Sequence, residues 1–100
     1  MKLATLTSAR AALKCYLAEV MLSLTETELS WIGKSLRAAS LRLRSRTCSV
    51  EILSAAYIPD DHRLACIVEA SCADDVHRLF GVALLPSARV VAANVVALQP

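Results

Sequence analysis

Two glutamates, Glu19 and Glu69, are the side chains best placed to do chemistry, because each interrupts a short apolar run. If the two runs form neighbouring strands and both carboxylates leave the sheet on one face, the pair can bind a cation or share a proton. The alternative is that each carboxylate lies at a strand end in water or pairs with an arginine, such as Arg63 or Arg89. The two interpretations predict different neighbours for the same two residues.

A second candidate is a soft metal site, for which Cys66 and His77 are the predicted ligands. Nickel, zinc and copper all accept imidazole and thiolate groups. His62 and the other cysteines add donors, but no two of these residues stand at a standard ligand spacing. The alternative places the histidines in a turn and on an exposed helix face, with the cysteines as small buried hydrophobic residues.

The aromatic and basic residues suggest two further surfaces. Trp31 lies off the apolar stripe of its predicted helix and is expected to face a ligand or partner, whereas Tyr16, Tyr57 and Phe80 are expected in the core. Five basic residues lie between Lys34 and Arg46. They are either the solvated face and last turn of a helix, or a docking surface for an acidic partner.

Two segments have the apolar spacing of amphipathic helices. The first begins at Thr25, which forms a capping box with Glu28, and it ends within 44–47. Its apolar stripe comprises Leu29, Ile32, Leu36, Ala39 and Leu43. The second begins within 71–75 and ends within 84–86, and its stripe comprises Val76, Leu79, Phe80 and Ala83.

Four segments have the composition of strands, and they cover residues 14–22, 48–59, 63–70 and 88–98. Turn residues at 59–62 join the middle two into an antiparallel hairpin. The resulting order predicts a ferredoxin-like α+β domain, a two-layer βαββαβ sandwich. Right-handed crossovers place both helices on one face of a four-stranded antiparallel sheet. The bare face is expected to be covered by a second subunit, a ligand or both, because it carries Leu17, Met21 and Ile67.

Length and composition limit the function classes. The chain of 100 residues fits one domain, predicted at 13–100 after an N-terminal extension at 1–12. A formal charge of +2 does not require nucleic acid, and acids on the central strands would repel phosphate. No run approaches the roughly 18–20 apolar residues of a membrane span. The N-terminus fits a secretory signal poorly, so we expect a cytoplasmic protein without a membrane partner.

The ordered motifs of residues 15–98 resemble a small bacterial family, formerly a domain of unknown function and now described as nickel-binding. The matching stretches are Tyr16–Glu19, Thr25–Leu29, Tyr57–Asp61, Cys66–Ala70 with Ala73 and Val76, Leu85–Pro86 and Arg89–Val91. The resemblance implies a ferredoxin-like fold, a homodimer and, in some members, bound nickel. The nickel-binding members carry a histidine-rich helix, whereas residues 75–81 hold one histidine, so Glu19, Cys66 and Glu69 are the matching landmarks able to line a site.

These observations predict a homodimeric, non-enzymatic protein that binds a metal ion or small ligand, or a family member that has lost its metal site. Glu19, Glu69 and Trp31 are the predicted ligand-binding residues, Cys66 and His77 the metal ligands, and nickel or another divalent transition metal the expected cofactor. No catalytic residue is predicted. One alternative is a cofactor-free monooxygenase or isomerase with a closed pocket between sheet and helices. Another is a protein-interaction module that uses the basic first helix.

Overall fold

The two central strands of the sheet alternate buried and less buried side chains, as expected for a sheet with one covered face. The computed structural model describes residues 13–45, 48–96 and 98, so the predicted N-terminal extension lies outside the described residues. The strands are β1 (Lys14–Met21), β2 (Val50–Ile58), β3 (Arg63–Ala70) and β4 (Arg89–Ala93). They form one antiparallel sheet in the order β2-β3-β1-β4.

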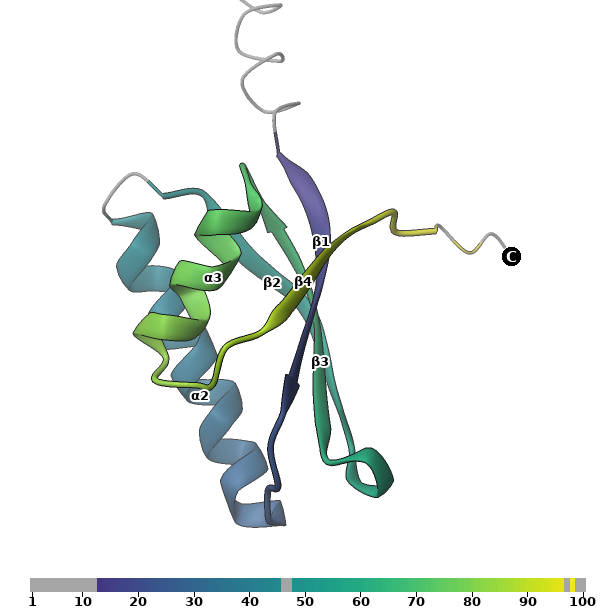
Figure 1. Ribbon diagram of the computed structural model, residues 1–100. Coiled ribbons are helices and arrows are strands. Elements are labelled where there is room, and N and C mark those ends of the chain that lie inside the picture. Colours follow the sequence, from purple (N-terminus) through teal and green to yellow (C-terminus); the bar gives the residue numbers. More distant parts are fainter. Residues whose placement is uncertain (1–12, 46–47, 97, 99–100) are drawn as a thin grey trace, which may run out of the picture.

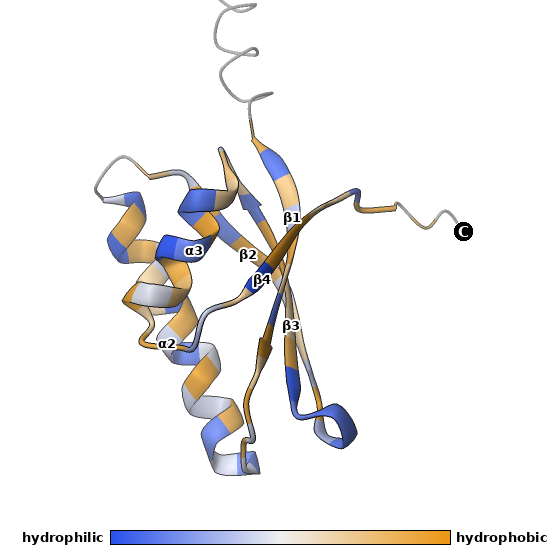
Figure 2. Ribbon diagram, viewed as in Figure 1, coloured by the Kyte–Doolittle hydropathy of each residue, from blue (hydrophilic) through white to orange (hydrophobic). Residues whose placement is uncertain are grey.

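Two helices, α2 (Glu26–Arg44) and α3 (Ala73–Val82), lie on the same side of this sheet (Figure 1). The prediction of a ferredoxin-like βαββαβ domain is therefore confirmed. Apolar residues recur along both helices between hydrophilic ones (Figure 2), which is the pattern of helices with one buried face. In the part of the chain that the structure describes, neither helix is long and apolar enough to cross a membrane.

The capping box predicted at the start of α2 is present. The Glu28 backbone N–H donates to the Thr25 hydroxyl at 3.2 Å, and the Thr25 N–H donates to the Glu28 carboxylate at 2.9 Å. Two of the N–H groups that a helix start leaves unpaired are thereby satisfied. Arg42 and Arg44 lie in the last turn, where positive charge suits the helix dipole.

The core lies between the helices and the covered face of the sheet. Phe80 and Leu79 of α3 and Ile32 and Leu36 of α2 are buried there. Below them lie the inward-facing residues of the two central strands, which are Tyr16, Ala18 and Val20 on β1 and Leu64, Cys66, Val68 and Ala70 on β3. The predicted core positions of Tyr16 and Phe80 are confirmed, and Tyr57 is half-buried at the edge.

Two strand predictions extend too far. β4 ends at Ala93 rather than at residue 98, because Ala93 pairs with Cys15 and β1 begins one residue earlier, at Lys14. Beyond that point β4 has no neighbour in the described sheet with which to pair. β2 begins at Val50 rather than Cys48, because the Cys48 N–H instead donates to the Leu43 carbonyl at the end of α2.

Candidate functional site

The sheet face away from the helices, called here the open face, is built from alternate residues of all four strands. Strand pairing places Val91, Leu17, Ile67 and Ser54 in one row across it, because each lies directly opposite the next. Leu17, Ile67 and Val91 are half-buried in the single chain. An apolar row on an uncovered sheet face is a feature of interaction surfaces.

One end of the open face is called here the arginine end, and it contains Glu19, Arg63 and Arg89. The Glu19 carboxylate accepts a hydrogen bond from Arg63 Nη1 at 3.1 Å and from Arg89 Nη1 at 3.2 Å. Only 17% of the Glu19 side chain is exposed, against 38% for Arg63 and 74% for Arg89. The alternative in which Glu19 pairs with these arginines is therefore the arrangement found, and the end carries a net positive charge.

The predicted pairing of Glu19 with Glu69 is wrong in its geometry, although both carboxylates do belong to the open face of adjacent central strands. Glu19 lies opposite Ala65, whereas Glu69 lies opposite Cys15. The two glutamates are thus four positions apart along the strands, about 13 Å at the rise of an extended chain. They cannot share a proton or chelate one ion.

Glu69 instead lies directly opposite Glu51 of β2, and these two residues form what we call the acidic end of the open face. The hairpin turn alone would place Glu51 opposite Ala70 and toward the helices. An irregularity between Ile52 and Ser54 shifts the pairing by one residue and turns Glu51 to the open face. Sequence reasoning missed Glu51 because nothing in the run from residue 50 to 58 marks that bulge.

The predicted metal ligands do not come together. Cys66 is fully buried on the covered face, where loss of solvation raises the pKa of its thiol to about 11. His77 is exposed on α3, and His62 closes the β2–β3 turn in a left-handed conformation with φ of 50°. Within the described residues, no group of three histidine, cysteine, aspartate or glutamate side chains is arranged to hold a metal ion. These residues therefore do not fit the nickel site that the resemblance implies.

The cysteines also differ from the expectation that all are buried. Cys72 is exposed at the start of α3, and Cys15 and Cys48 are half-buried. The Cys48 Sγ lies 3.4 Å from Asp75 Oδ1 and 3.5 Å from Arg78 Nη1, so this thiol joins a small polar cluster. Only Cys66 has the position of a small hydrophobic core residue.

Trp31 is 64% exposed on α2, and this helix lies on the covered side of the sheet (Figure 1). It does not share a site with Glu19 or Glu69. Its predicted contact with a ligand or partner stays a prediction.

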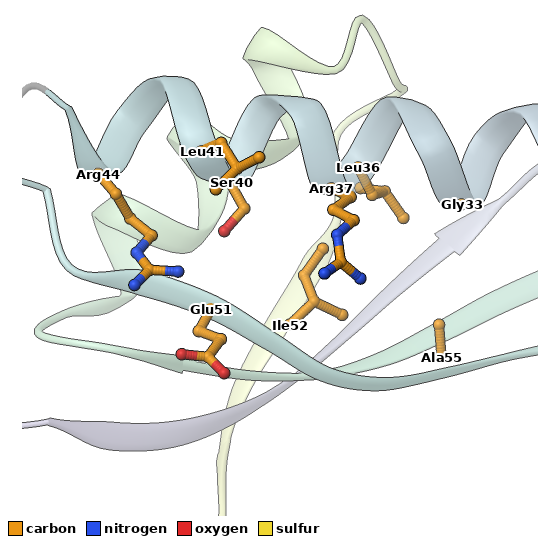
Figure 3. A pocket seen from close by; sticks show the side chains of 9 residues that line it. All are labelled: Gly33, Leu36, Arg37, Ser40, Leu41, Arg44, Glu51, Ile52 and Ala55. Carbon is orange, nitrogen blue, oxygen red and sulfur yellow. The ribbon is translucent and has the colours of Figure 1, made fainter.

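Hollows in the described surface lie at the margins of the fold. One, with a volume of about 270 Å³, lies between α2 and β2 at the outer edge of the sheet (Figure 3). Between the layers, the described side chains of both helices and the central strands pack into one cluster. The enclosed pocket that a cofactor-free enzyme needs is not formed by the described residues.

No known family model and no curated protein matches the sequence. The crystal structure of SCO4226 from Streptomyces coelicolor A3(2) is similar in fold, with a TM-score of 0.68 and 16% sequence identity. The similarity covers 83% of this chain and 99% of that chain. At this identity it shows a shared α+β fold alone.

Proposed function

We propose that the protein is a non-enzymatic binding module that acts as a homodimer, in which the open faces of two copies pack together. The observation that carries this proposal is the apolar row formed by Leu17, Ile67 and Val91, flanked on its two sides by groups of opposite charge. The dimer implied by the resemblance to the nickel-binding family agrees with it, and membership of that family is part of the proposal. No metal is included, because the described residues do not form a ligand set.

The charges favour one of two symmetric arrangements. If the twofold axis runs across the strands, the acidic end of one copy lies over the arginine end of the other. If the axis runs along the strands, the acidic ends of both copies lie at the same end of the interface. Like charges brought together in a low-dielectric interface repel, so we expect the first arrangement, with Glu69 near Arg63 of the partner subunit.

Sedimentation of the full chain tests the dimer. We expect a dimer of wild-type protein, and a monomer when Leu17→Arg places a charge in the apolar row. Leu84→Arg is the matched control, because Leu84 is 89% exposed after α3, away from the open face, and its replacement should leave the dimer intact. A wild-type monomer throughout the accessible concentration range would contradict the proposal.

Glu69→Lys tests the orientation by the sign of its effect. With the axis across the strands, the new lysine meets the partner's arginine end and the dissociation constant of the dimer rises about tenfold or more. With the axis along the strands, the same change relieves repulsion at the acidic end and strengthens the dimer. Repeating the measurement at high salt should shrink either effect, since salt screens charges near solvent.

A further inference from the structure

The groove between α2 and the outer edge of β2 adjoins the acidic end of the open face, since Glu51 belongs to both. Arg37 and Arg44 extend into it from the helix toward the strand (Figure 3). We propose that it binds an extended acidic segment of a partner protein, which adds to β2 as a further strand of the sheet. This proposal does not depend on the homodimer.

The backbone of β2 is free to accept such a strand. β2 is the first strand in the order β2-β3-β1-β4, so in the described sheet it has β3 on one side and no strand on the other. An edge strand presents unpaired N–H and C=O groups to which an extended peptide can bind. At its start the edge is covered, since the Val50 carbonyl accepts a hydrogen bond from the buried Ser40 hydroxyl at 2.8 Å.

The groove has an apolar lining that can select a side chain. Leu36, Leu41, Ile52 and Ala55 line it, and Leu41 is 56% exposed. A leucine-sized side chain of the partner would cover Leu41 and Ile52 and remove apolar surface from water. An apolar residue at the centre of the bound segment follows from this lining.

The charges of the groove predict which residues flank the apolar residue of the bound segment. Arg37 and Arg44 are seven residues apart on α2, which is about 10 Å along the helix axis. Among the described residues neither arginine takes part in an ion pair. Glu51 lines the same groove, but its register directs its carboxylate toward the open face (Figure 3). Arg44 also lines a second hollow, at the start of β2, together with Glu51 and Glu69.

An extended segment matches this spacing when acids stand four residues apart with an apolar residue midway. Alternate residues of a strand point the same way, and four residues span about 13 Å, which the flexible arginine side chains can follow. A second copy of this chain fits less well. Its own edge strand, residues 50–58, contains Glu51 as its one acid and cannot neutralise both arginines.

Fluorescence anisotropy with a labelled heptapeptide, Thr-Glu-Thr-Leu-Thr-Glu-Thr, tests the proposal. We expect saturable binding to the full chain, weakened about tenfold or more by Arg37→Glu with Arg44→Glu. Arg42→Glu is the matched control, because Arg42 is exposed on the same helix but does not line the groove, and its replacement should change the affinity by less than about twofold. The same peptide with both acids replaced by lysine should not bind.

Chemical shifts of the β2 amides locate the bound peptide, and circular dichroism confirms that each variant is folded. Shifts at residues 51–56 are expected on titration. Equal losses of peptide affinity in Arg42→Glu and in the double variant Arg37→Glu with Arg44→Glu would overturn the proposal, since binding would then depend only on the total charge of the helix. So would absence of binding at millimolar peptide, or dimerisation through β2 that excludes the peptide. Binding to the monomeric Leu17→Arg variant with unchanged affinity would show that the groove works whether or not the open faces pair.

Discussion

The two faces of the sheet are formed by the same strands but differ in the residues they carry and in what covers those residues. On the covered face, Cys66 and Val68 are fully buried under the helices and contain no group that needs water. On the open face, their neighbours Ile67 and Glu69 are half-buried, and charged residues flank the apolar row on both sides. The covered face is thus completed within one chain, whereas the open face has the composition of a surface completed by a partner.

The largest expected effect that separates the faces is on stability. Phe80→Ala on the covered side should reduce the free energy of unfolding by about 3–5 kcal/mol at every protein concentration, because it leaves a cavity in one chain. Ile67→Ala should reduce the free energy of unfolding by less at low protein concentration and by more as the concentration rises, because the surface that Ile67 contacts belongs to a second copy of the chain. Urea denaturation over about a hundredfold range of concentration measures both. A concentration-independent loss for Ile67→Ala would remove this distinction between the faces.

A second difference concerns pH, because the covered face holds the buried thiol of Cys66. In the unfolded chain a cysteine ionises near pH 8.5, whereas burial raises the pKa of Cys66 to about 11 in the folded protein. As the pH rises, the thiol therefore loses its proton first in the unfolded state. The contribution of Cys66 to the free energy of unfolding is complete below about pH 8.5 and is lost as the pH rises to about 11. The difference between these two pKa values corresponds to roughly 3 kcal/mol of stability.

Unfolding measured from pH 8 to 11 checks this with two variants. Cys66→Ala should flatten the decline in stability, although it lowers the overall value. Cys72→Ala, which removes an exposed thiol at the start of α3, is the control for the loss of a thiol outside the core. Identical slopes for wild type and Cys66→Ala would show that the thiol titrates normally in the folded protein.

The smallest effect tests how the covered face is closed at its edge. The Tyr57 hydroxyl donates to the Leu22 carbonyl at 3.1 Å and accepts from the Leu24 N–H at 2.9 Å, which joins β2 to the β1–α2 connection. Tyr57→Phe leaves both partly buried groups unpaired and should cost about 1–2 kcal/mol in thermal or urea unfolding. A loss below about 0.5 kcal/mol would mean that water replaces the hydroxyl.

Local chemistry predicted the elements well. The Thr25–Glu28 capping box specifies the start of α2, and the alternation from Arg63 to Ala70 matches β3 at both ends. These signals act between residues close in sequence, so they are readable without the fold. The last strand was predicted too long because its end depends on where β1, far away in the sequence, supplies a pairing partner.

The candidate site was predicted only in part. Glu19 and Glu69 were correctly assigned to one face, because side-chain alternation is a property of each strand alone. Their separation depends on the register between β1 and β3, which no turn connects. Glu51 and the groove beside Arg37 were missed for a similar reason, since a bulge and the packing of α2 over the sheet edge place them.

By itself, the sequence determined the order of elements, their amphipathic faces and hence the ferredoxin-like domain with one uncovered sheet face. The tertiary structure alone decided which charges meet: Glu19 with two arginines, Glu69 with Glu51, and Arg37 and Arg44 beside the edge strand β2 of the described sheet. The physical reason is that hydrophobic periodicity is encoded locally, whereas strand register and helix placement are set by contacts between distant segments, and a shift of one residue moves a charge to the other face.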